Sequence, residues 1–264
     1  MTSKINFSNI ATLLFDIDNT LLLFDEKKFI PEYSRLIYNY FQTEFPNFEV
    51  FTQTFLQSTH KMLDKEPKGI TNLEKFALNF SSQMEEKISS QEIINRFFHF
   101  YNNDFPRLAK IVTPHPIAKD ILKLATPYFQ LVAATNPLFP AVANEIRLGW
   151  AKIDSGRINW LEVTSADDYT FTKPHIEYYK ELLNRINQPA ESCLMIGNDP
   201  INDLVAGELG IKTFLIQDGR NQYSKVIKTN LDEKTPKFKA DYSGTLADFY
   251  NSLKIYIKNK ETIL

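Results

Sequence analysis

The 264-residue chain contains a single cysteine, Cys193, and therefore cannot form a disulfide within itself. Cys193 lies in an apolar run, which favours a buried structural thiol. A chain without disulfides fits a reducing compartment, and residues 1–9 are too polar for a secretory signal. We therefore expect a cytoplasmic protein.

Long apolar runs and a surplus of one charge are also missing. No run approaches the roughly 18–20 residues of a membrane-spanning helix, so no membrane partner is expected. Thirty Lys and Arg against 32 Asp and Glu give a net charge of −2, and such a balance creates no general attraction for nucleic acid. Aromatic residues are abundant instead, with 21 Phe and 12 Tyr in a chain that is 43% hydrophobic.

Short apolar runs alternate with helix-like segments along most of the chain. Strands are predicted at residues 10–15, 129–134, 158–163, 193–196, 212–216 and 240–242. Helices are predicted at residues 117–125, 140–148, 175–186, 204–209 and 246–257. This alternation indicates parallel βαβ units and an α/β fold with a doubly wound, Rossmann-like sheet.

The alternation is interrupted after the first predicted strand. Residues 32–45, 50–63, 73–87 and 91–102 have helical patterns, and proline-containing or polar segments separate them. The sequence therefore predicts a helical-bundle cap at residues 22–108, inserted into an α/β core formed by residues 1–21 and 109–264.

Polar residues gather directly after predicted strands. They are Asp16, Asp18 and Thr20 after the first strand, Thr135 and Asn136 after the second, and Asn198, Asp199 and Asp203 after the fourth. Lys173 precedes the helix predicted at residues 175–186. Because ligands bind at the carboxyl ends of strands in open α/β sheets, we expect these residues to meet at one edge.

The residue types at this edge favour chemistry on phosphate. Several carboxylates at one place repel one another unless a cation joins them, and oxygen ligands suit Mg²⁺ shared with a phosphate. An aspartate can act as a covalent nucleophile, and a second carboxyl group can transfer protons. Thr, Asn and Lys donors would stabilise the remaining phosphoryl oxygens.

This pattern resembles the haloacid dehalogenase superfamily of aspartate-nucleophile phosphohydrolases. The family's motifs, in order, are Asp-x-Asp-x-Thr, a Ser or Thr after the next core strand, a Lys before a helix, and an acidic pair after a strand. The matching residues are Asp16, Asp18, Thr20, Thr135, Lys173, Asp199 and Asp203.

The resemblance implies specific roles for these residues. It implies Asp16 as the nucleophile and Asp18 as the general acid and base. The Asp16 carboxylate, the Asp18 backbone carbonyl and Asp199 would hold Mg²⁺, and Thr135, Asn136 and Lys173 would bind the phosphoryl group. It implies a magnesium-dependent phosphatase acting on a small phosphomonoester, such as a nucleotide or sugar phosphate, with a substrate-selecting cap at residues 22–108.

The fourth motif departs from the usual Gly-Asp beginning, because Gly197 is followed by Asn198 and then Asp199. Either Asn198 or Asp199 could take the metal position. We favour Asp199, because a carboxylate is the stronger magnesium ligand. Asp203 would then orient a water molecule or Lys173.

Three other functions remain open at this point. A metal-independent haloacid dehalogenase also uses an Asp nucleophile, but it lacks the second acid of the first motif, so Asp18 argues against it. A phosphomutase would use the same phosphoryl-aspartate. A non-catalytic binding protein could retain the fold, although every expected catalytic residue type is present. The sequence does not indicate the oligomeric state.

Overall fold

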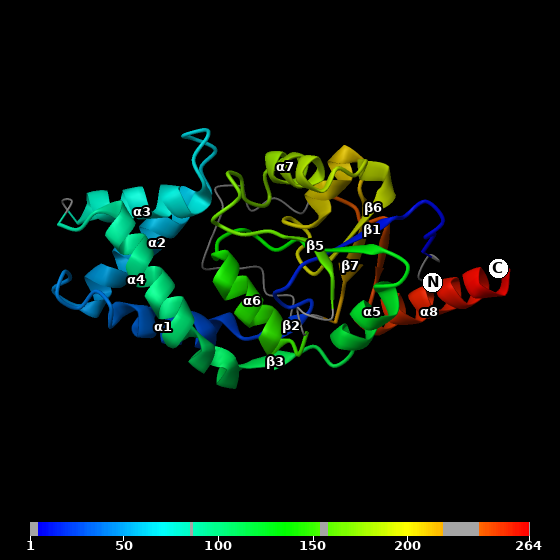
Figure 1. Cartoon of the computed structure of the whole chain (residues 1–264), viewed down its shortest axis with the longest axis horizontal. Coiled ribbons are helices and arrows are strands. Elements are labelled where there is room, and N and C mark those ends of the chain that lie inside the picture. Colours follow the sequence, from blue (N-terminus) through cyan, green and yellow to red (C-terminus); the bar gives the residue numbers. More distant parts are fainter. Residues whose placement is uncertain (1–4, 85–86, 154–157, 219–237, 264) are drawn as a thin grey trace.

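A six-stranded parallel sheet forms the centre of the protein (Figure 1). The computed structural model describes residues 5–84, 87–153, 158–218 and 238–263. The strand order is β5-β4-β1-β6-β7-β8, and the doubly wound α/β prediction is confirmed. The strands are β1 (Thr12–Phe15), β4 (Gln130–Ala133), β5 (Trp160–Val163), β6 (Cys193–Gly197), β7 (Lys212–Ile216) and β8 (Tyr242–Gly244).

Helical layers cover both faces of the sheet, so the central strands are buried on both sides. All four residues of β1 are buried. Leu13 and Phe15 contribute to the core that includes α5 (Ala118–Ala125) and α8 (Leu246–Ile263). Leu14 lies in the opposite core, with α7 (Ile176–Ile186) and the 3₁₀ helix η3 (Leu204–Leu209).

A second helical unit, which we call the cap, lies at one end of the molecule (Figure 1). Its elements are α1 (Glu26–Tyr38), α2 (Phe48–Met62), α3 (Asn72–Gln83), α4 (Ser90–Asn103) and the 3₁₀ helix η1 (Phe105–Ile111). The cap has its own core, which is rich in phenylalanine. Helix α6 (Ala141–Trp150) joins the two parts, because Ala143 belongs to the cap core and Leu148 to the core of the sheet.

The two connections between the cap and the sheet run side by side as strands. β2 (Leu22–Phe24) pairs antiparallel with β3 (Val112–Pro114). This pair was not predicted from the sequence, because strands of three residues carry too little periodic pattern. None of the helices among the described residues is long and apolar enough to cross a bilayer.

The predicted start of the first cap helix was wrong. Helix α1 begins at Glu26 rather than at residue 32, and Pro31 lies inside it. The Asp25 carboxylate accepts a hydrogen bond from the Lys27 backbone N–H at 3.0 Å, and this cap starts the helix ahead of the proline. Helix α3 ends at Gln83, before residues 85–86 of the predicted helix, which lie outside the described part of the chain.

We expect Phe51→Ala in α2 to lower the free energy of unfolding by about 3–5 kcal/mol, as is typical for a buried Phe. Phe51 is fully buried, and its ring lies 5.3 Å from that of Phe45 and 6.1 Å from that of Phe41. Leu78→Ala in α3 is the control, because Leu78 is 52% exposed, and it should change stability by less than about 0.5 kcal/mol. Urea denaturation measures both, and similar losses would contradict this cap core.

Candidate active site

The polar residues expected at strand ends meet at the carboxyl edge of the three central strands. Asp16 follows β1, Thr135 lies just beyond β4, and Asn198 follows β6. Strands β4 and β6 flank β1 on its two sides. This is the switch point of the sheet, where open α/β folds bind their ligands.

Lys173 joins two of the carboxylates at this edge. Its Nζ lies 3.2 Å from Asp16 Oδ1 and 2.7 Å from Asp203 Oδ1, and its side chain is 1% exposed. Burial opposes the charge on Lys173, but Asp16 and Asp203 outweigh this effect and hold its pKa well above the usual range. Lys173 is therefore a cation that neutralises part of the buried negative charge.

Asp16 lies where its negative charge is costly. Burial raises the pKa of Asp16 to about 7, despite the opposing effect of Lys173, and Asp203 and Asp18 raise it further. Burial also raises the pKa of Asp203. Two carboxylates that are both disfavoured as anions depend on nearby cations to remain ionised at neutral pH.

Asp203 is held by the turn that follows β6. Its Oδ2 accepts a hydrogen bond from the Asp199 backbone N–H at 2.9 Å. A Cβ atom at Gly197 would lie only 2.1 Å from this oxygen, so this position requires glycine. Asp203 precedes η3 but makes no side-chain cap to it. Its carboxylate therefore serves Lys173 and the turn rather than the helix.

Asp199 and Asn198 have different surroundings. Asp199 Oδ1 accepts hydrogen bonds from the backbone N–H groups of Ile201 and Asn202, at 2.8 and 2.9 Å, as in an Asx turn. Its Oδ2 accepts a third, from the Asn202 amide at 2.9 Å. The Asn198 side chain is buried, and its Oδ1 accepts a hydrogen bond from the Thr20 hydroxyl at 3.4 Å. Asn198 thus connects the first motif to the fourth.

The loop after β4 is fixed from two directions. The Thr135 carbonyl accepts hydrogen bonds from the Thr164 hydroxyl at 2.7 Å and the Tyr178 hydroxyl at 3.0 Å. Asn136 Oδ1 accepts one from the Lys173 backbone N–H at 3.1 Å. The structure therefore places Thr135, Asn136 and Lys173 together.

Arg147, a residue that the sequence analysis missed, pairs with Asp18. Its guanidinium group donates to Asp18 Oδ1 and, at 2.5 Å, to Asn144 Oδ1. It also lies 4.6 Å from the centre of the Phe139 ring, as in a cation–π contact. The Arg147 side chain is only 2% exposed. The available signal was its position three residues after Asn144, on the apolar stripe of the helix predicted at residues 140–148.

Glu26 is a second residue that the sequence analysis missed. It is the first residue of α1 and lies half-buried at the start of the cap. Burial raises the pKa of Glu26 to about 7, and repulsion from Asp18, Asp199 and Asp25 raises it further. Glu26 thus adds a further carboxyl group beside Asp18 and Asp199, and its charged form is disfavoured there. No sequence signal separated Glu26 from an ordinary acid in the first turn of a helix, because its closeness to Asp18 and Asp199 depends on how the cap packs against the sheet.

These features define the class: a doubly wound α/β protein with a charged site at its switch point and a helical cap. A profile of the haloacid dehalogenase-like hydrolases matches residues 10–210. The chain therefore belongs to the haloacid dehalogenase-like hydrolases, as the motifs predicted. No curated protein sequence matches the chain significantly.

Solved structures share the fold across almost the whole chain. A 2-haloacid dehalogenase from Pseudomonas syringae pv. Tomato DC3000 is 16% identical, with a TM-score of 0.58, over 94% of this chain and 99% of that one. A HAD phosphatase from Thermococcus onnurineus is 15% identical, with a TM-score of 0.53, over 92% and 97% of the two chains. At these identities the likeness concerns the fold, which carries both chemistries.

The pairing of Asp18 with Arg147 predicts a specific coupling. Asp18→Asn should lower the free energy of unfolding by about 1–3 kcal/mol, because it leaves a buried guanidinium group without its counter-charge. In an Arg147→Met background the same change should cost less than about 0.5 kcal/mol, because the ion pair that Asp18→Asn breaks is already absent. The effects of the two substitutions on stability should therefore not add. Urea denaturation of the wild type, the two single variants and the double variant measures this coupling. An equal cost of Asp18→Asn in both backgrounds would contradict the ion pair.

Proposed function

We propose that this protein is a magnesium-dependent phosphatase that hydrolyses a small phosphomonoester through a phosphoryl-aspartate at Asp16. The observation that carries the proposal is the second carboxyl group, Asp18, at the same strand end as Asp16. A nucleophilic aspartate alone would serve a phosphatase or a haloacid dehalogenase equally well. A second acid two residues later supplies the proton that an alcohol leaving group needs.

The donor atoms at the strand ends suit a hard divalent cation. Among the described residues, no three His, Cys, Asp or Glu side chains are arranged to hold a metal ion by themselves. The proposed set therefore uses mixed oxygen donors, namely the Asp16 carboxylate, the Asp18 backbone carbonyl and the Asn198 amide oxygen. Mg²⁺ accepts few protein ligands and keeps several waters. The raised pKa values of Asp16 and Glu26 are consistent with a cation here, because burial and, after it, repulsion from neighbouring carboxylates disfavour their charged forms.

The residues of the chain divide the reaction between them. The Asp16 carboxylate attacks phosphorus, and Asp18 donates a proton to the departing alcohol oxygen. Asp18 then takes a proton from the water that hydrolyses the acyl phosphate. The phosphoryl oxygens are stabilised, as charge develops on them, by Lys173, Thr135 and Asn136. Bound magnesium would neutralise the substrate phosphate beside Asp16.

We expect the protein to release phosphate from benzyl phosphate with Mg²⁺ and to lose this activity in excess chelator. Asp16→Asn should abolish turnover, because the amide is no nucleophile, and should abolish the acid-stable phosphate on the chain. Malachite-green assays and mass spectrometry of rapidly quenched protein measure these outcomes. Full activity in chelator, or phosphate on another residue, would refute the proposal. Chloride release from 2-chloropropionate in chelator would instead identify the dehalogenase chemistry.

The contacts of the fourth motif favour Asn198 over Asp199 at the metal position. The Asp199 carboxylate already accepts three hydrogen bonds within its own turn. We therefore expect Asn198→Asp to tighten Mg²⁺ binding at least tenfold, because it adds a carboxylate to the donor set. Asn198→Ala should weaken binding more than Asp199→Asn does. Isothermal titration with Mg²⁺ measures all three variants, and a larger loss with Asp199→Asn would restore the register expected from the sequence.

A further inference from the structure

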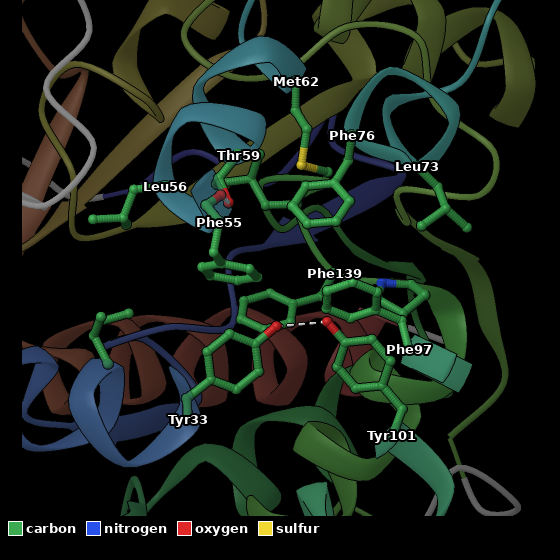
Figure 2. A pocket seen from close by; sticks show the side chains of 13 residues that line it. Tyr33, Phe55, Leu56, Thr59, Met62, Leu73, Phe76, Phe97, Tyr101 and Phe139 are labelled. Atoms are coloured by element: carbon green, nitrogen blue, oxygen red, sulfur yellow. Dashed lines mark hydrogen bonds between the residues drawn. The ribbon is translucent and has the colours of Figure 1, made fainter. Parts of the chain in front are cut away.

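An apolar pocket lies between the cap helices and the loop that follows β4 (Figure 2). Its volume is about 100 Å³. Aromatic rings form much of its wall, and they belong to Tyr33, Phe55, Phe76, Phe97, Tyr101 and Phe139. Figure 2 shows that these side chains come from different cap helices and from the loop, and that they gather around one space.

One wall of the pocket continues directly from the phosphoryl-binding loop. Thr135 and Asn136 lie at the strand end, and Phe139 lines the pocket three residues further on. Three residues span at most about 11 Å. The Arg147 guanidinium group lies 4.6 Å from the centre of the Phe139 ring and also binds Asp18. The pocket wall and the proposed proton donor are therefore in contact with the same side chain.

A second wall comes from α1. Glu26, at the start of this helix, is close enough to Asp18 and Asp199 for their charges to raise its pKa. Ile30 lies one turn later, on the same side of the helix, and lines the pocket. Both α1 and the loop after β4 thus run from the charged site to the pocket.

The polar atoms of the lining are largely occupied. The hydroxyl groups of Tyr33 and Tyr101 bind each other at 2.6 Å, which leaves one hydroxyl hydrogen for another partner. The Thr59 hydroxyl donates to the Phe55 carbonyl at 2.9 Å. Burial first, and the neighbouring tyrosine next, raise the pKa of Tyr33 well above its usual range, so it stays neutral. A sugar or a nucleobase would bury several polar groups here without partners, at a cost that an apolar group avoids.

We propose that this pocket receives the leaving group of the substrate, and that this group is apolar: a single ring or a branched alkyl chain. The inference rests on the proposed phosphatase function. A cavity of roughly 150 Å³ lined by Leu, Ile and Phe binds benzene. At about 100 Å³ this pocket is smaller, so it would hold a small branched alkyl group, or a single ring that is only partly enclosed. The expected substrate class narrows from nucleotide or sugar phosphates to apolar phosphomonoesters.

The test compares phosphate esters of primary alcohols, so that the leaving groups have similar reactivity. We expect kcat/KM for benzyl phosphate to exceed that for glycerol 1-phosphate and glucose 6-phosphate at least tenfold. Leu73→Trp, which fills the pocket from α3, should lower the ratio of benzyl phosphate to methyl phosphate activity at least tenfold. Leu56→Trp, from α2, should act in the same direction. Preference for a sugar phosphate would overturn the proposal.

A matched control lies on the same helix as Leu73. Leu78 is 52% exposed and does not line the pocket, so Leu78→Trp should keep the wild-type ratio. An equal fall in the ratio with Leu73→Trp and Leu78→Trp would overturn the pocket assignment.

A binding measurement separates this proposal from the proposed reaction. ¹⁹F NMR should show that 4-fluorobenzyl alcohol binds the wild-type protein and that Leu73→Trp weakens this binding at least tenfold. Binding without hydrolysis of any ester would refute the phosphatase while supporting an apolar ligand in this pocket. Hydrolysis without such binding would support the phosphatase and overturn the pocket as its leaving-group site.

Discussion

The buried ammonium group of Lys173 holds the candidate site together. It lies between Asp16, at the end of the central strand, and Asp203, in the turn after β6. Two buried carboxylates this close would repel each other without a cation between them. The same residue fixes the loop after β4, because its backbone N–H donates to Asn136. One side chain and its backbone thus link three separate strand ends.

A second cation extends this order toward the cap. Arg147 lies on α6, the helix that contributes to both cores, and pairs with Asp18. The start of α6 is fixed as well, since the Asp167 carboxylate accepts a hydrogen bond from the Ala141 backbone N–H at 2.5 Å. The position of Asp18 therefore depends on packing between the cap and the sheet. A change in that packing would reach the candidate site through α6.

The sequence predicted what depends on local pattern. Alternating apolar runs were sufficient for the sheet, and the residues at strand ends were sufficient for the family. It missed Glu26, because an acid in the first turn of a helix has the same local pattern in water and beside other carboxylates. It missed Arg147 because a place on the apolar stripe of a helix does not show which carboxylate the residue meets. It placed the start of α1 too late, because Pro31 appeared to precede the helix, whereas the Asp25 cap outweighs it. The preference for Asp199 rests on ligand chemistry alone, because a sequence does not show the three hydrogen bonds that the Asp199 carboxylate accepts within its turn.

The charged residues lie at the strand ends, and the apolar pocket lies between the cap helices and the loop after β4. This separation has a consequence for the proposed reaction. The phosphoryl end of a substrate would meet Asp16 and Lys173. Because every phosphomonoester has the same phosphoryl group, these contacts would be nearly the same for all of them. Discrimination must then come from the rest of the molecule, and only interactions maintained in the transition state raise kcat/KM. An apolar group held against Phe139 would satisfy this condition, because it stays in place while the bond to phosphorus breaks. It would also displace water from the ring that lies against Arg147, the side chain that orients Asp18. In the proposed reaction, substrate selection and the positioning of Asp18 are two effects of the same contact.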